Sequence, residues 1–137
     1  MTIREKQAAL IARYSIIEDA QERLAAIVAR GRKWPGVADE EKNDAQRVRG
    51  CVSQVWLAGG RDGELCRFRM SADSPLVQGL AALICELYDG GAAEEIMEVE
   101  PELLEALGLA RQLSPTRLNG LAHVRRTIRE FAAAHPA

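Results

Sequence analysis

Hydrophobic side chains in the first third of the chain recur at the spacing of one helix face. They are Ile3, Leu10, Ile11, Tyr14 and Ile17, followed by Leu24, Ile27 and Val28. This stripe predicts helices up to a stop at Gly31. Ser15 is the expected cap of a second helix, because Glu18 three positions later completes a capping box. The polar segment 39–46 is either a short helix or a surface loop.

Two segments in the middle of the chain alternate between apolar and polar side chains, as strands do. They are residues 52–58 and residues 64–70. The glycine-rich stretch between them, residues 59–63, predicts a hairpin connection. The second segment places Cys66 on an apolar face, which we expect to be core. Because two strands alone are marginal, a third is expected around residues 46–49.

Two Ser-Pro pairs predict helix starts in the second half of the chain, because a hydroxyl caps free amides and proline fits the first helical position. Ser74-Pro75 precedes a leucine stripe that ends at Gly90, and Cys85 falls opposite that stripe, at a secondary contact or the surface. Ser114-Pro115 precedes a final helix with one apolar face. Three arginines lie toward its other side and are expected to be solvated, with docking of a partner as the alternative: Arg125, Arg126 and Arg129.

Short helices are also indicated at residues 93–98 and 101–107. This order of elements predicts one α+β domain over residues 1–137, with a small antiparallel sheet of about three strands packed against helices. A chain of this length buries roughly two-thirds of its unfolded surface, so it can hold a core without metal or disulfide bonds. We find neither an internal repeat nor a linker that would divide the chain.

Charge and hydropathy limit the possible partners. Eighteen Lys and Arg against 20 Asp and Glu give a formal charge of -2, which argues against a general nucleic-acid binder. The first six residues carry charges where a secretory signal would be apolar, and no apolar run approaches the length of a membrane span. We therefore expect a soluble, cytoplasmic protein with no membrane partner.

The three cysteines, Cys51, Cys66 and Cys85, include no C-x-x-C pair, and both histidines lie far along the chain. This spacing favours neither a disulfide framework nor a zinc site. No bound metal or cofactor is expected.

Cys51 is the candidate reactive residue. It follows Gly50, which leaves room near the sulfur and permits unusual backbone angles, and Arg47 and Arg49 lie just upstream. Thiol reactivity depends on such surroundings. Position alone leaves a second interpretation open, in which Cys51 is a small buried hydrophobe.

The motif Val48-x-Gly50-Cys51-x-Ser53-x-Val55-Trp56 resembles the cysteine motif of the SufE/CsdE family of sulfur-acceptor proteins. Three further stretches agree with that family in order and spacing: Ala72-Asp73-Ser74 before the helix containing Gly79-Leu80, the Leu107-Gly108-Leu109 turn, and residues 113–121. The resemblance runs from about Tyr14 to Phe131. Gln46 and Gln112 stand where the family often has asparagine and histidine, and no motif separates the SufE branch from the CsdE branch.

The resemblance implies an IscU-like α+β fold and a sulfur relay rather than a stand-alone enzyme. In such a relay, a pyridoxal-phosphate cysteine desulfurase takes sulfur from L-cysteine as a persulfide. The acceptor cysteine, matched here by Cys51, takes the terminal sulfur, stimulates the desulfurase and carries the sulfur to an iron–sulfur scaffold or another acceptor. Desulfurase and scaffold are thus the implied partners, and the protein could be a monomer or a homodimer.

The resemblance also implies a role for Arg117, which matches the arginine of the family's Ser-Pro-x-Arg motif. Its guanidinium would orient or stabilise the anionic sulfur on Cys51, whereas an ordinary surface arginine is the alternative. The expected supporting loop consists of Arg49, Gly50, Val52 and Ser53. We interpret Asp73 and Ser74 as a helix cap and Trp56 as core packing, and Cys66 and Cys85 are expected to pack, with any redox role undecided.

Two other functions remain open at this point. Three cysteines on an IscU-like fold could belong to an iron–sulfur scaffold, although such clusters usually require four ligands. The chain could also be a binding module that has kept the fold but lost the relay. For the relay itself, we expect the Gly50-Cys51 loop to swing between a buried and an extended position.

Overall fold

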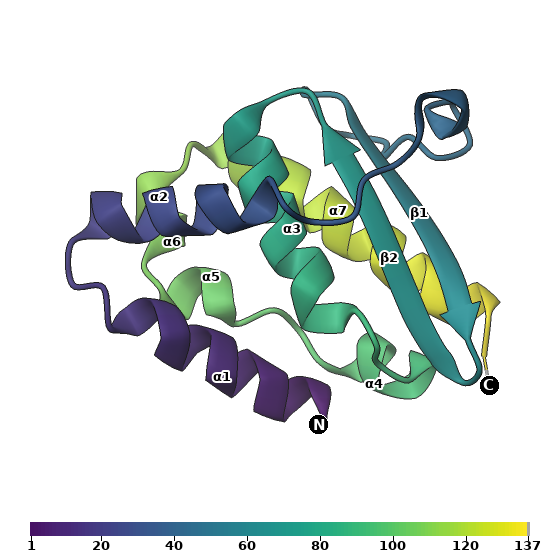
Figure 1. The fold of residues 1–137 in the computed structure, drawn as a ribbon, viewed down its shortest axis with the longest axis horizontal. Helices are drawn as coiled ribbons and strands as arrows, with labels where there is room; N and C mark the ends of the chain where they lie inside the picture. Colours follow the sequence, from purple (N-terminus) through teal and green to yellow (C-terminus); the bar gives the residue numbers. More distant parts are fainter. Residues whose placement is uncertain (137) are drawn as a thin grey trace.

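The sheet and the surrounding helices pack around one apolar helix, α3 (Pro75–Tyr88), which lies in the middle of the fold in Figure 1. The computed structural model describes residues 1–136. Within them, the other elements are α1 (Ile3–Ser15), α2 (Ala20–Gly31), a short 3₁₀ helix (Asp39–Glu41), β1 (Val55–Asp62), β2 (Leu65–Ala72), α4 (Ala93–Glu98), α5 (Leu103–Ala106), α6 (Leu109–Gln112) and α7 (Pro115–Ala134). The predicted α+β class is confirmed.

The antiparallel strands β1 and β2 pair in register from Val55 opposite Ala72 to Asp62 opposite Leu65. The hairpin is present, but the connection predicted over residues 59–63 is wrong. Strand β1 continues through the two glycines, and the chain turns only at Gly63, where φ is 63°. Gly59 serves packing instead. A Cβ at this position would lie 2.5 Å from the ring of Phe131, so the glycine lets α7 approach the sheet.

A third, short segment extends the sheet where the sequence predicts a third strand. The amide of Val48 donates to the carbonyl of Val55 over 2.8 Å, and the amide of Leu57 donates to the carbonyl of Gln46 over 2.8 Å. These bonds flank an isolated antiparallel bridge between Arg47 and Trp56. The segment therefore pairs with β1 through one bridge and is too short to form a regular strand.

The hydroxyl groups of Ser74 and Ser114 cap α3 and α7, as the Ser-Pro pairs predict. The predicted cap at Ser15 is wrong. Ser15 is the last residue of α1, and the side chain of Asp19 caps α2 by accepting from the amide of Glu22 over 2.9 Å. A carboxylate suits this position because it also interacts favourably with the positive end of the helix dipole.

The remaining short helices agree with the predicted bounds in one case and differ in the others. The helix at Ala93–Glu98 has the predicted bounds. The helix expected over 101–107 is shorter and is followed by α6, and Gly108, with φ of 72°, joins the two. The undecided segment 39–46 begins with the short 3₁₀ helix at Asp39–Glu41 and continues as turns. None of the helices within residues 1–136 is both apolar and long enough to span a bilayer.

Arg125, which was expected in solvent, is buried, and so is Cys85, which was expected at a secondary contact or the surface. Cys85 is inaccessible to solvent, because α3 is covered both by the sheet and by neighbouring helices. Arg125 is also buried, with its guanidinium 4.5 Å from the centre of the Tyr88 ring and Nη2 donating to the carbonyl of Val99 over 3.1 Å. Of the three arginines expected in solvent, Arg126 and Arg129 are exposed.

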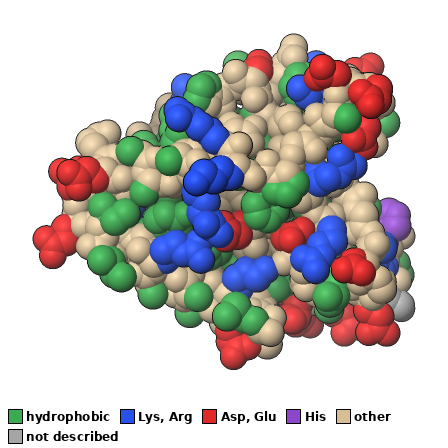
Figure 2. Space-filling model, viewed as in Figure 1, with side chains coloured by type: hydrophobic (Ala, Val, Ile, Leu, Met, Phe, Trp, Pro, Cys, Tyr) green, Lys and Arg blue, Asp and Glu red, His purple; other side chains and the backbone are tan. Residues whose placement is uncertain are grey.

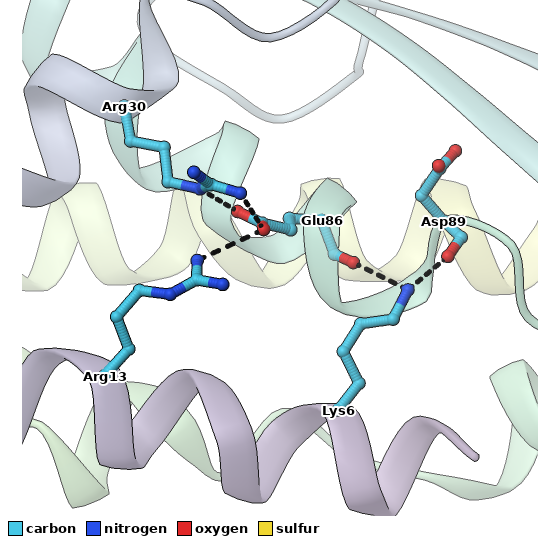
Figure 3. A network of polar contacts seen from close by, with 5 residues as sticks. All are labelled: Lys6, Arg13, Arg30, Glu86 and Asp89. Carbon is cyan, nitrogen blue, oxygen red and sulfur yellow. Dashed lines mark hydrogen bonds and ion pairs between the residues drawn. The ribbon is translucent and has the colours of Figure 1, made fainter. Parts of the chain in front are cut away.

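The C-terminal end of α3 is joined to α1 and α2 by a polar network (Figure 3). The carboxylate of Glu86 accepts from Arg30 in two bonds of 2.8 and 2.7 Å and from Arg13 over 3.4 Å. Lys6 donates to the main-chain carbonyls of Glu86 and Asp89. Partial burial raises the pKa of the Glu86 carboxyl, but bonds from Arg30 and Arg13 outweigh it, so its pKa lies below the usual value. Glu86 thus stays ionised while bridging two helices.

Helices α2 and α3 cross at a contact between two glycines. A Cβ on Gly31 would overlap the Cα of Gly79, and a Cβ on Gly79 would lie 2.6 Å from the Cα of Val28. Neither position leaves space for a side chain, so the two backbones are in direct contact. Both positions therefore require glycine for close approach of the helices.

We predict that Gly79→Ala lowers the free energy of unfolding by about 1–3 kcal/mol, because the added methyl group forces the two helices apart. Alanine is the better helix former by about 1 kcal/mol, so the clash must exceed that gain. Urea denaturation measures the difference. Gly60→Ala is the matched control, since a Cβ there has no neighbour within 4 Å. Equal stability of Gly79→Ala and the wild type would contradict this account.

Candidate functional site

Cys51 lies in the loop that connects residues 46–48 to β1 and contacts the first half of α7. Its thiol donates to the main-chain carbonyl of Gly120 over 3.3 Å, and the residue is half-buried. The next side chain, Val52, is 82% exposed. The loop therefore turns its sulfur toward the protein and an apolar side chain toward solvent.

Gly50 is required on the N-terminal side of the cysteine. Its φ is 89°, in the left-handed region that favours glycine. A Cβ there would also overlap the imidazole ring of His123 on α7. The sequence indicates the glycine but not its neighbour, because no motif or spacing connects His123 with the cysteine.

Asp73 secures the C-terminal side of the cysteine loop. Its carboxylate accepts from the amide of Gln54 over 3.1 Å, and its own amide donates to the carbonyl of Gln54, also over 3.1 Å. Of the predicted cap pair, only Ser74 caps the helix. Asp73 instead ties the cysteine loop to the end of β2.

A mainly apolar pocket of about 210 Å³ opens beside the sulfur, between the loop, α3 and the start of α7. It is lined by Cys51, Val52, Ser53, Val77, Leu80, Ser114, Thr116, Arg117, Gly120, Leu121 and Val124. The structure thus places four of the predicted site residues around one cavity: Cys51, Val52, Ser53 and Arg117. The other two, Arg49 and Gly50, line a separate groove on the other side of the loop.

Arg117 reaches this pocket because the Ser114 cap places it in the first turn of α7. Its amide donates to the hydroxyl of Ser114 over 3.2 Å, and its side chain is exposed at the pocket. A cation and the positive end of a helix dipole both favour a nearby anion. The arrangement can therefore stabilise negative charge on a group that extends from Cys51 into the pocket.

Burial controls the protonation of the cysteine. It raises the pKa of the Cys51 thiol, and the charge of Arg47 offsets this only in part. The protonated thiol is also the form that can donate to Gly120. Because the thiolate is the nucleophile, the sulfur is protected in this conformation.

The other two cysteines lie deep in the core. Cys66, which was expected on the apolar face, is fully buried near the hairpin turn, where it pairs with Arg61. Cys51 precedes the opposite end of β1, roughly 20 Å away along the strand. Burial raises the pKa of both Cys66 and Cys85. Among the described residues, no three His, Cys, Asp or Glu side chains are placed to hold a metal ion.

Trp56 does not pack in the core as expected. Alternation along β1 places Val55 and Leu57 inside, whereas Trp56 is half-buried on the other face. The amine of Lys42 lies 5.3 Å from the centre of its ring. This tryptophan therefore contributes to the outer surface of the sheet.

Comparisons with known proteins cover nearly the whole chain. The SufE family, described as an Fe-S metabolism associated domain, matches residues 8–132. A SufE-like protein of Rhizobium etli is 31% identical over 90% of this chain and 87% of its own length. A SufE-like protein of Synechocystis is 30% identical over 97% of this chain and 84% of its own length.

Two further matches extend the comparison. Part of a chloroplastic quinolinate synthase of rice is 36% identical over 69% of this chain, which corresponds to 14% of that protein. The solution structure of a hypothetical protein from Thermus thermophilus has a TM-score of 0.78 and 20% identity, with 94% of each chain covered. That structure supports the fold, and the family match together with the similar sequences decides the assignment. This chain belongs to the SufE family, whose domain is associated with Fe-S metabolism.

Proposed function

We propose that this protein is a sulfur acceptor that takes persulfide sulfur onto Cys51 from a pyridoxal-phosphate cysteine desulfurase. It thereby stimulates the desulfurase and passes the sulfur on for iron–sulfur cluster assembly. The observation that supports this most is the environment of Cys51 in a SufE-family chain. The thiol is half-buried at a mainly apolar pocket, in a loop whose next side chain, Val52, is exposed.

The proposed transfer is a thiol–persulfide exchange. The thiolate of Cys51 attacks the outer sulfur of the donor's persulfide, a new sulfur–sulfur bond forms on Cys51, and the donor's bond breaks. The donor cysteine leaves as a thiolate, and the proton of Cys51 passes to solvent or to that leaving group. No external oxidant or reductant is needed, because one sulfur–sulfur bond replaces another.

The pocket has a role in the state after transfer. A persulfide is an anion at neutral pH, and such sulfur species oxidise readily when they are exposed to solvent and oxidants. The pocket beside Cys51 has room for an added sulfur atom, and Arg117 lies at its edge. We assign Arg117 the role of holding the charged sulfur there, and we assign this chain the role of carrier rather than enzyme.

The iron–sulfur scaffold, as the alternative function, has little support from the geometry. Cys66 and Cys85 are fully buried, and Cys66 lies at the far end of the strand from Cys51. A cluster on all three would require the core to open. The positions instead favour one functional thiol, Cys51, and two packing residues.

The decisive test is the intact mass of the protein after incubation with a purified cysteine desulfurase and L-cysteine. We expect the wild type to gain the mass of one sulfur atom, and reductant should remove it. Cys51→Ser should show no gain, whereas Cys66→Ala and Cys85→Ala should still gain sulfur if they fold. Sulfur retained by Cys51→Ser would overturn the assignment.

We predict that Arg117→Ala slows sulfur transfer to Cys51 about fivefold to tenfold, because a favourable interaction of about 1 kcal/mol with the anionic sulfur is lost. Arg117→Lys should restore part of the rate, since it keeps the charge. Single-turnover transfer followed by mass spectrometry measures the rate. Arg111→Ala, an exposed arginine on α6, is the matched control. Transfer at the wild-type rate in Arg117→Ala would rule out this role.

Movement of the loop can be tested by alkylation of Cys51 across a range of pH. Burial raises its pKa, so at neutral pH the folded protein should react more slowly than a peptide of residues 47–55. The difference in alkylation rate between the folded protein and the peptide should narrow as the pH rises through the higher pKa of the Cys51 thiol in the folded protein. A desulfurase that draws the loop out of the pocket should raise the alkylation rate of Cys51 when it is added without L-cysteine. Equal alkylation rates with and without desulfurase would argue against a swinging loop.

A further inference from the structure

A second cavity system lies on the other side of the cysteine loop from the apolar pocket. One groove of about 280 Å³ is lined by Asp44, Arg47, Val48, Arg49, Gly50 and Cys51. An adjoining groove of about 340 Å³ shares three of these residues and continues onto α7, where His123, Arg126, Thr127 and Glu130 line it. We call the two together the basic groove, after Arg47, Arg49 and Arg126.

Within the described part of the chain, the three arginines of the basic groove have no acidic partner. Among residues 1–136, none of them forms an ion pair within 4.0 Å, although Asp44 and Glu130 also line the groove. All three arginines are exposed. The groove therefore carries more positive than negative charge, on a chain whose overall formal charge is -2.

Some arginines elsewhere on the molecule are paired with carboxylates of the protein itself. Lys and Arg side chains are also prominent on the face shown in Figure 2, which is viewed as in Figure 1. Several arginines of the fold are neutralised in place: Arg30 binds Glu86 in a two-bond pair, and Arg69 binds Glu41 in the same way, with bonds of 2.8 and 2.7 Å. The guanidinium groups of the basic groove retain this capacity for two-bond pairing with a carboxylate.

The position of the basic groove determines what must cover it. A protein that brings a persulfide to Cys51 also covers the residues next to Cys51, because a stable interface buries about 800 Å² on each partner. Arg49 is two residues from the sulfur, and Arg47 is four. Burying their charges without a partner is unfavourable, whereas carboxylates on the incoming surface would compensate for the lost hydration.

We infer that the basic groove docks an acidic segment of the sulfur-donating protein, with Asp or Glu side chains that pair with Arg47, Arg49 and Arg126. This inference rests on the proposed function, since it names a feature of the partner at the same site. The attraction of opposite charges steers the donor toward the cysteine loop, so it acts chiefly on the rate of association and weakens with salt.

The first test measures how the rate of sulfur transfer depends on the concentration of this protein, with a purified cysteine desulfurase and L-cysteine. We expect the double variant Arg49→Glu/Arg126→Glu to raise the apparent KM about tenfold at low salt. This difference should shrink in about 1 M salt, where the screening length is about 3 Å. Arg4→Glu is the matched control, because Arg4 is an exposed residue of α1, which lies far from the cysteine loop in Figure 1.

A second test needs no desulfurase. A fluorescein-labelled octaglutamate peptide should bind the wild type and Arg4→Glu in low salt, and the double variant about tenfold more weakly or not at all. Circular dichroism establishes that each variant is folded. Equal peptide affinity for the wild type and the double variant, or a KM that the double substitution leaves unchanged, would overturn the inference.

The two proposals fail in different ways. If the wild-type protein gains no sulfur on Cys51, the proposed function fails, while the peptide still reports whether the groove binds acidic chains. If sulfur is transferred normally but neither measurement responds to charge reversal, the acceptor function stands and the docking role of the basic groove is excluded.

Discussion

The burial of α3 is the constraint on which the rest of this structure depends. Most of its side chains are excluded from water, and the hydroxyl of Tyr88 is paired with the carbonyl of Val99 over 2.6 Å. Near its start, Val77 and Leu80 form one wall of the pocket beside Cys51. At its other end, Glu86 binds arginines of α1 and α2. A shift of this helix would therefore disturb both the pocket and the packing of the N-terminal helices.

The cysteine loop is held by neighbours that come from distant parts of the chain. Asp73 at the end of β2 holds one side of it, and Gly120 and His123 of α7 contact the other. The loop separates two cavities of opposite character, an apolar pocket and a basic groove. In the proposed relay, the pocket shelters sulfur and the groove receives the partner, so one short loop serves both steps.

Short-range patterns predicted much of the fold. Both Ser-Pro helix starts, the third segment of the sheet and the burial of Cys66 agree with the structure, because capping and alternation depend on residues only a few positions apart. The glycines at 59 and 60 led to the wrong prediction of a turn over residues 59–63. A glycine that permits a turn and a glycine that permits close packing look the same in a sequence, and at Gly59 the contact is with Phe131 at the far end of the chain.

The sequence by itself determined the α+β class, the two Ser-Pro helix starts and the candidate thiol, and its motifs indicated Arg117 as a second site residue. Only the tertiary structure decided that His123 lies against Gly50 and that Asp73 anchors the loop. It also decided that Arg125 is buried while Arg126 remains exposed in the basic groove. The physical reason is that periodicity and capping are local effects. Burial and charge pairing depend on which surfaces the other elements cover, and those elements are far apart in sequence.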